Sequence, residues 1–395
     1  MPVAHLSAVI LRYATSLVMH SPSTQNAITK SAVTRNVMLP GVALLGFLLP
    51  LPAIAQTADF SPSPYTYSSL NIFGDSLVDT GNIFNLTGRP PSPPYAQKLS
   101  NDTLWVEPFA DALNLSPTLS SEALPNLLSG APAPTEGINF ALAGSLSSDQ
   151  STAPPLPGLQ QQLETFQSIS PLLPTDDNSL FVIVAGANDY NSAIANPTNP
   201  TTPESLTNQV TDNLTNAASA LIDTGAKNLL IANLPNLGLQ PFAKQLNQIN
   251  PQSSTLLTSL AAGHNQLLSQ KLTTLADTTG VNITSLDLNE IFTDIENDPA
   301  RFGFTNIEDS CLTNFQPGFQ FEGICDNPDE FVFWDNVHPT AAAHDIIAQF
   351  ALTALKDDKK EGQEVPEPSV VFSLLSVGGM VLLRNRTGSR NKVRR

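Results

Sequence analysis

Short, continuously apolar runs alternate along this chain with longer stretches of helical periodicity, and this alternation limits its fold more than any other feature. The strand candidates are residues 69–73, 137–142, 180–185, 228–232 and 281–286. Runs that are apolar on both faces are typical of strands in a buried parallel sheet. Between them, apolar residues follow helical spacing, as over residues 257–275 and 343–354. The pattern therefore predicts an α/β fold with a parallel sheet and helices on both faces.

Residues 1–55 are predicted to form a leader rather than part of the fold. They hold three basic residues and no acidic residue, and an apolar run from Met38 ends in Ala53-Ile54-Ala55. A basic region followed by an apolar run and small residues is typical of a secretory signal, here cleaved before Gln56. A retained membrane anchor is the alternative, which the shortness of the run and its prolines disfavour.

The other end is predicted to form a second sorting segment. A charged linker over residues 356–364 precedes a tail over 365–395, which contains Val365-Pro366-Glu367-Pro368-Ser369, an apolar run and six basic residues. By composition alone the tail would be a weak membrane anchor. It resembles the PEP-CTERM sorting signals of exported bacterial proteins. The resemblance implies handling by export and sorting machinery, membrane contact only through the leader and tail, and a secreted or surface-attached mature protein.

The remaining residues are strongly acidic. Residues 1–55 and 370–395 hold nine of the 18 basic residues and none of the 35 acidic ones, so residues 56–369 carry nine basic side chains against 35 acidic. Such a surface repels nucleic-acid phosphates and anionic membranes, and it favours a neutral substrate. Solubility alone also accounts for most of these carboxylates. We find no second folded domain, so residues 69–355 are predicted to form one domain.

The only two cysteines, Cys311 and Cys325, lie close in sequence within the exported part. In an oxidising compartment they are expected to form a disulfide that closes a small loop. Free thiols or a metal pair are less favoured, because no nearby histidine completes a zinc site.

Ser76, Asp335 and His338 are candidates for nucleophilic catalysis. Ser76 follows a predicted strand and precedes a helix-compatible stretch over residues 77–84. A serine hydroxyl becomes a nucleophile when an imidazole takes its proton and a carboxylate orients that imidazole. His338 precedes Pro339 and stands three residues after Asp335, so a turn between them can bring carboxylate and imidazole together. Read singly, Ser76 and Asp335 would be helix caps.

The histidine inventory supports His338 as the base. Of five histidines, His5 and His20 lie in the leader, which leaves His264, His338 and His344. His264 falls on an apolar helical stripe and His344 beside one, so we interpret both as structural residues.

Four sequence blocks occur in the order of the blocks of the GDSL, or SGNH, hydrolases, which this chain resembles over about residues 69–355. The branch it resembles most is that of the plant-type lipases/acylhydrolases and autotransporter esterases. The four blocks are Phe73-Gly74-Asp75-Ser76-Leu77-Val78-Asp79-Thr80-Gly81-Asn82, Asn139-Phe140-Ala141-Leu142-Ala143-Gly144, Gly186-Ala187-Asn188-Asp189 and Asp335-Asn336-Val337-His338-Pro339.

The resemblance implies a three-layer αβα sandwich of flavodoxin-like type and five site residues. Ser76 would be the nucleophile, His338 the general base and acid, and Asp335 its orienting partner. The oxyanion would be held by the backbone N–H groups of Ser76 and Gly144 and by the amide of Asn188. The chain departs mildly from the plant-type pattern, which often has a richer glycine run around Gly144. We interpret Asp79 and Asp189 as loop-holding residues.

The sequence thus predicts an exported serine esterase or lipase that needs no metal or organic cofactor. Its substrate would be a carboxylic ester of a lipid, a short acyl chain or an acetylated glycan, cleaved through an acyl-serine intermediate. Two alternatives remain open: a catalytically silent surface or matrix protein that keeps the fold, and, less favoured by the histidine spacing, a metal-dependent phosphoesterase.

Overall fold

A computed structural model describes residues 66–196 and 202–361, with side chains as far as residue 356. The chain divides into two units, residues 1–354 and 355–395. The first unit contains the sheet and the candidate site. The predicted leader over residues 1–55 and the predicted tail over 365–395 lie outside the described residues. Within the part of the chain that is described, no helix is both long enough and apolar enough to cross a membrane.

A six-stranded parallel sheet forms the centre of the first unit, as the apolar runs predict. Its spatial order is β2-β3-β1-β4-β5-β6. The middle strands β1 and β4 are buried along their whole length, which explains why their sequences are apolar on both faces. The strand bounds are β1 Leu70–Gly74, β2 Thr118–Leu119, β3 Ile138–Asn139, β4 Leu180–Val184, β5 Asn228–Ala232 and β6 Asn282–Leu286.

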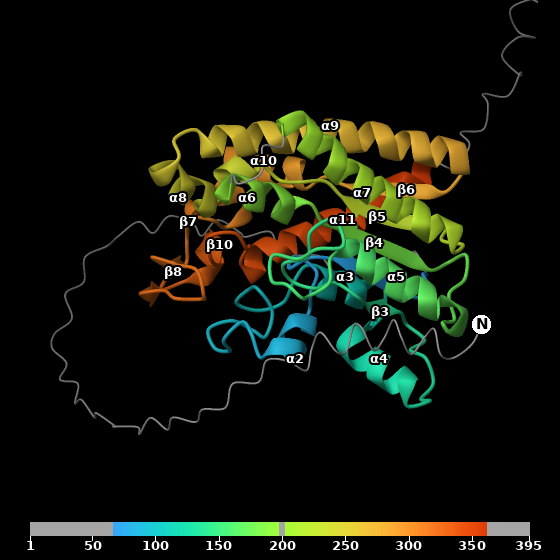
Figure 1. The fold of residues 1–395 in the computed structure, drawn as a ribbon. Helices are drawn as coiled ribbons and strands as arrows, with labels where there is room; N and C mark the ends of the chain where they lie inside the picture. The colour runs from blue at the N-terminus through green and yellow to red at the C-terminus, as the bar shows by residue number, and fades with distance from the viewer. Residues whose placement is uncertain (1–65, 197–201, 362–395) are drawn as a thin grey trace, which may run out of the picture. The chain divides into compact units, whose positions relative to one another are not determined.

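Helices cover both faces of this sheet and give the predicted αβα sandwich (Figure 1). On one face, α5, α7 and α9 pack on the side chains of Phe73, Phe181 and Ile231 in one apolar core. Alternate residues such as Val182 point to the opposite face, where α3 and α11 lie. The helices are α2 Asn82–Thr87, α3 Val106–Ala112, α4 Ser120–Leu128, α5 Leu159–Ile169, α6 Ala187–Ala195, α7 Pro203–Asp223, α8 Pro241–Ile249, α9 Ser253–Thr279, α10 Leu288–Asn297 and α11 Ala341–Glu361.

Four short strands and four 3-10 helices complete the described part of the fold. Strand β7 pairs with β10 in parallel, and β8 pairs with β9 as a small antiparallel hairpin. Their bounds are β7 Asn306–Ser310, β8 Leu312–Thr313, β9 Gly323–Ile324, β10 Phe331–Phe333, η1 Ser170–Leu172, η2 Leu237–Leu239, η3 Pro299–Phe302 and η4 Pro328–Glu330.

Two element boundaries differ from the sequence-based expectation. The run 137–142 forms only the two-residue strand β3, because the chain then leaves the sheet as a buried loop that remains tied to β1 by the bond from Leu142 N–H to the Gly74 carbonyl. The linker expected at residues 356–364 is helical through Glu361. Lysine and glutamate are good helix formers, and extending an existing helix is easier than starting one.

The predicted disulfide between Cys311 and Cys325 is present, with Cα atoms 4.8 Å apart. It joins the start of the β8–β9 hairpin to the residue that follows it. Both sulfurs belong to an apolar cluster, called here the hairpin cluster, which also contains Tyr95, Leu312 and Trp334 with partly buried Leu99, Phe315, Phe319, Phe321 and Phe331. The hairpin has few ladder bonds of its own, so its position depends on this cross-link and on the cluster.

Replacing both cysteines by serine should lower the free energy of unfolding by about 3 kcal/mol, because the cross-link closes a loop of this size in the unfolded chain. Urea denaturation of the double variant beside the oxidised and the reduced wild-type protein measures this. Reduced wild type should match the double variant, and equal stability of all three would contradict the expectation.

Candidate active site

Ser76 lies just beyond the carboxyl end of β1, at the edge where ligands bind in open parallel sheets. Gly74, with φ 144°, makes this approach possible, because a Cβ there would collide with the backbone carbonyl oxygen of Val184 on β4. The next residue, Asp75, donates its N–H to the same carbonyl at 3.0 Å. Close contact between β1 and β4 therefore fixes where the serine emerges.

The helix expected directly after Ser76 is wrong: α2 begins only at Asn82. A single helical turn follows Asp75, whose carbonyl accepts the N–H groups of Val78 and Asp79. Asp79 then bonds the N–H groups of three following residues, and Gly81 turns the chain with φ 149°. These local bonds compete with helix formation, and the helix begins five residues later than expected.

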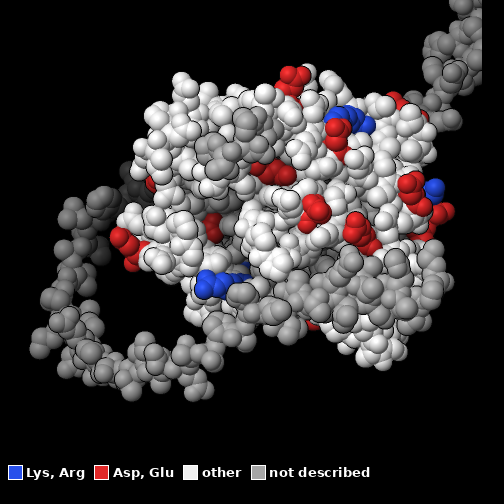
Figure 2. Space-filling view, viewed as in Figure 1, with Lys and Arg blue, Asp and Glu red and all other residues white. Residues whose placement is uncertain are grey.

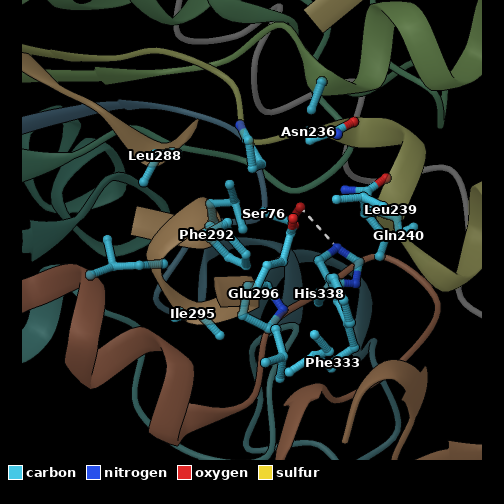
Figure 3. Close-up of a pocket in the computed structure, with 18 of the residues that line it drawn as sticks. Ser76, Asn236, Leu239, Gln240, Leu288, Phe292, Ile295, Glu296, Phe333 and His338 are labelled. Carbon is cyan, nitrogen blue, oxygen red and sulfur yellow. Dashed lines mark hydrogen bonds between the residues drawn. The ribbon is translucent and has the colours of Figure 1, made fainter. Parts of the chain in front are cut away.

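His338 meets Ser76 from the other end of the chain, as the sequence predicts (Figure 3), and Asp335 bonds the far side of its imidazole. Asp335 follows β10, and the turn after it brings His338 Nδ1 to 2.8 Å from both carboxylate oxygens. His338 Nε2 lies 3.0 Å from Ser76 Oγ. The three side chains therefore form one continuous hydrogen-bonded chain.

The carboxylate of Asp335 is almost fully buried, with 1% of its surface exposed. Burial raises the pKa of Asp335. The neighbouring His338 charge and the hydrogen bonds from the His338 ring and from the N–H groups of His338 and Val337 lower it, and together they outweigh burial, so the net shift of the pKa is downward. Asp335 therefore stays ionised and can stabilise a positive charge on the imidazole.

The predicted oxyanion donors are only partly assembled around Ser76. Within the described residues, the backbone N–H groups of Ser76 and Gly144 have no hydrogen-bond acceptor, as a donor reserved for a ligand requires. Asn188, at the start of α6, lines the same pocket as Ser76 and His338. Its amide donates to the Ser145 carbonyl at 3.0 Å, which leaves its second N–H available.

Gly144 is not among the residues that line this pocket. Its φ of 85° and the proximity of the Thr152 hydroxyl, which lies 2.6 Å from where a Cβ would be, account for a glycine at this position. It precedes Ser145, the residue that Asn188 contacts, so the loop that carries Gly144 does reach the Asn188 side of the site.

Gln162 on α5 is a site-supporting residue that sequence reasoning missed. Its side chain is fully buried and bonds both the N–H and the carbonyl of Gly74 at 2.8 Å. The same amide donates to Ser145 Oγ at 2.9 Å. One glutamine thus links the nucleophile segment to the loop after Gly144. A glutamine within an amphipathic stretch gives no local signal of such a role.

The two loop-holding aspartates act as expected. Asp79 also accepts the N–H of Ala143 at 2.8 Å and so ties the first block to the second. Asp189 accepts both the N–H and the hydroxyl of Ser147. Burial raises the pKa of each to about 6, although hydrogen bonds from these backbone groups lower it.

Asp75 is a further buried carboxyl at the site and lines the pocket. Burial raises its pKa to about 7, while the N–H of Leu77 and the His338 charge act in the opposite direction. Burial therefore favours the neutral form of Asp75, in contrast to Asp335.

The other two histidines of the described residues are buried away from this chain of bonds. His264 contacts the Tyr190 hydroxyl through Nδ1 at 3.0 Å, and His344 lies inside α11. Burial lowers the pKa of both to about 3. Both are therefore neutral core residues at ordinary pH, as the helical spacing indicates.

A pocket lined mainly by apolar side chains opens beside Ser76 and His338. Figure 3 shows Leu288, Phe292 and Ile295 of α10 on one side of the serine and Leu239 on the other. Further apolar lining comes from Ile307, Val332, Phe333 and Ile347. The described residues that line it include no Lys or Arg. The surface in Figure 2 likewise carries scattered Asp and Glu side chains and few basic ones.

The chain matches the family of GDSL-like lipases/acylhydrolases over residues 70–351. A phosphatidylcholine-sterol acyltransferase of Aeromonas hydrophila is 27% identical over 353 residues, which cover 78% of this chain and 96% of that protein. GDSL esterase/lipase 5 of Arabidopsis thaliana is 26% identical, covering 71% of this chain and 81% of its own. The structure of a lipolytic protein of the G-D-S-L family from Veillonella parvula DSM 2008 has 11% identity and a TM-score of 0.37, covering 73% of this chain and 98% of that one.

The matched region begins in β1, just before Ser76, and ends in α11, just after His338. It spans most of the chain and contains all five predicted site residues. This protein therefore belongs to the GDSL-like lipase/acylhydrolase family and, with it, to the carboxylic ester hydrolases.

Proposed function

We propose that this protein cleaves neutral acyl esters through an acyl-serine intermediate formed on Ser76. The hydrogen-bonded chain of Ser76, His338 and Asp335 is the observation that carries the proposal. Ser76 Oγ attacks the ester carbonyl while His338 Nε2 takes its proton, and Asp335 stabilises the imidazolium that results. His338 then returns the proton to the departing alcohol. A water activated by the same imidazole releases the acid and restores Ser76.

The negative oxygen that forms on the substrate would be held by N–H groups that have no acceptor within the described residues. The N–H groups of Ser76 and Gly144 lack acceptors within the described residues, and Asn188 contributes an amide whose donor strength does not change with pH. Binding by Gly144 rests on the family resemblance and requires its N–H to turn toward the pocket.

The apolar pocket favours an aliphatic acyl chain over an acetyl group. Apolar side chains form most of the lining, and each methylene of an acyl chain that is buried against them contributes about 0.8 kcal/mol. Phe292 of α10 and Phe333 of β10 stack in its wall with ring centres 6.5 Å apart. The acidic surface and the lining without basic residues support an uncharged ester, in line with the charge of the sequence.

Export remains part of the proposal and rests on the sequence alone. The leader over residues 1–55 and the PEP-CTERM-like tail over 365–395 support a secreted or surface-attached enzyme whose membrane contact is confined to these ends. The disulfide between Cys311 and Cys325 is consistent with an oxidising compartment. The competing role, a silent matrix protein, would not require an intact hydrogen-bonded chain at Ser76.

Ser76→Ala should reduce hydrolysis of a p-nitrophenyl ester by roughly four orders of magnitude or more, because the covalent route is lost. Initial rates of the folded variant and wild type, with folding checked by circular dichroism, measure the effect. Ser69→Ala, which removes a buried hydroxyl bonded to Ser179 at the opposite end of β1, serves as the control. Retained activity in the Ser76 variant would contradict the proposed mechanism.

Asn188→Ala should lower kcat by about a hundredfold or more, as the loss of one oxyanion donor does. Asn265→Ala is the matched control, since Asn265 also donates its amide to a backbone carbonyl, that of Leu234, outside the pocket. Steady-state kinetics should show a large kcat loss only for Asn188→Ala. Equal kcat in the two variants would exclude Asn188 from transition-state binding.

For wild-type enzyme, kcat/KM should rise with acyl length from acetyl to hexanoyl esters by up to about fourfold per methylene. Phe292→Ala should flatten this rise, because it removes one wall of the pocket. The acetyl ester is the internal control, since its short chain does not extend along that wall. A wild-type series that is flat or falls with length would contradict the acyl assignment of this pocket.

A further inference from the structure

Tyr95 touches the candidate catalytic chain from the segment between α2 and α3. Its hydroxyl donates to Asp335 Oδ2 at 2.7 Å, across 240 residues of sequence. Only 2% of the tyrosine surface is exposed. The other carboxylate oxygen, Oδ1, accepts the backbone N–H groups of Val337 and His338, both at 2.9 Å.

The two oxygens of the Asp335 carboxylate are held by different hydrogen-bond donors. The turn of the chain fixes Oδ1, whereas Oδ2 has no backbone donor within the described residues and is fixed only by Tyr95 and by the imidazole itself. His338 Nδ1 is 2.8 Å from both oxygens. The orientation of the imidazole ring, and with it the direction of Nε2 toward Ser76, therefore depends on how the carboxylate plane is oriented.

The tyrosine ring is itself held on two sides by the hairpin cluster. Phe319 meets it edge to face at 5.4 Å between ring centres, and Trp334 does so at 6.1 Å. Trp334 directly precedes Asp335, and Phe319 belongs to the loop that the disulfide between Cys311 and Cys325 closes. The ring is therefore fixed both by the residue next to Asp335 and by the disulfide-closed loop.

We propose that Tyr95 is a positioning residue, the fourth member of a Tyr95–Asp335–His338–Ser76 chain, which orients the Asp335 carboxylate so that His338 faces the serine. This role rests on the proposed function of Ser76. Burial and the Asp335 charge raise the pKa of Tyr95 far above its usual range. The phenol therefore keeps its proton and acts as a donor throughout the working range of an esterase.

Tyr95→Phe tests the proposal, because it keeps the ring in the hairpin cluster and removes only the hydroxyl. Hydrogen bonds to charged groups contribute about 1.5–3 kcal/mol, so kcat should fall by about tenfold or more while KM stays within about twofold. The Nδ1 proton resonance of His338 should also move in the NMR spectrum of the variant. Tyr190→Phe is the matched control, because it removes an equally buried hydroxyl that is bonded to His264. It should change neither kcat nor the His338 resonance.

The outcomes separate the two proposals. A Tyr95→Phe enzyme with the kcat of Tyr190→Phe, or with an unmoved His338 resonance, overturns the role of Tyr95. Wild-type protein that hydrolyses no ester overturns the proposed function, and the NMR comparison still decides whether Tyr95 orients the Asp335–His338 pair. Should Tyr95→Phe fail to fold, Phe319→Leu keeps the hydroxyl but loosens the ring, and it must show a smaller kcat loss and a resonance change in the same direction.

Discussion

A single buried carboxylate, Asp335, imposes the strictest condition on this fold. An ionised group removed from water is costly unless donors surround it, and here they come from three places: the turn at Val337 and His338, the imidazole ring, and Tyr95. Each donor depends on a different part of the molecule. The strand β10, the disulfide-closed hairpin and the loop that carries Tyr95 must all be in place before the carboxylate is satisfied.

The parallel sheet brings this assembly to Ser76. Because β1 and β4 are neighbours, the segments that follow them, with Ser76 and Asn188, emerge at the same edge. Gly74 allows their backbones to touch, and Gln162 ties β1 to the loop after β3. A sheet of short buried strands thus fixes the positions of the reacting groups, while loops and α10 form the pocket that selects the substrate.

The sequence predicted those features whose signal is local. The apolar runs located β1, β4, β5 and β6 to within about one residue, since burial on both faces leaves a continuous apolar signature. Histidine counting and block order pointed to Ser76, Asp335 and His338, which the structure brings together. The short strand β2 was missed because two residues carry no periodicity.

Other features depend on contacts distant in sequence and could not be read from it. Gln162 and Tyr95 act through partners 88 and 240 residues away, and neither differs locally from an ordinary helix or loop residue. The helix expected after Ser76 did not form for the opposite reason. Asp79 bonds the N–H groups of three residues that follow it, and these local bonds compete with a helix there.

The central claim, that Ser76 is a nucleophile activated by His338, is tested most directly by mapping a fluorophosphonate adduct on the intact protein by peptide mass spectrometry. The account predicts one adduct per chain, on Ser76, which Asp335→Asn slows and His338→Ala abolishes. An unlabelled protein, or an adduct on another serine, would contradict it.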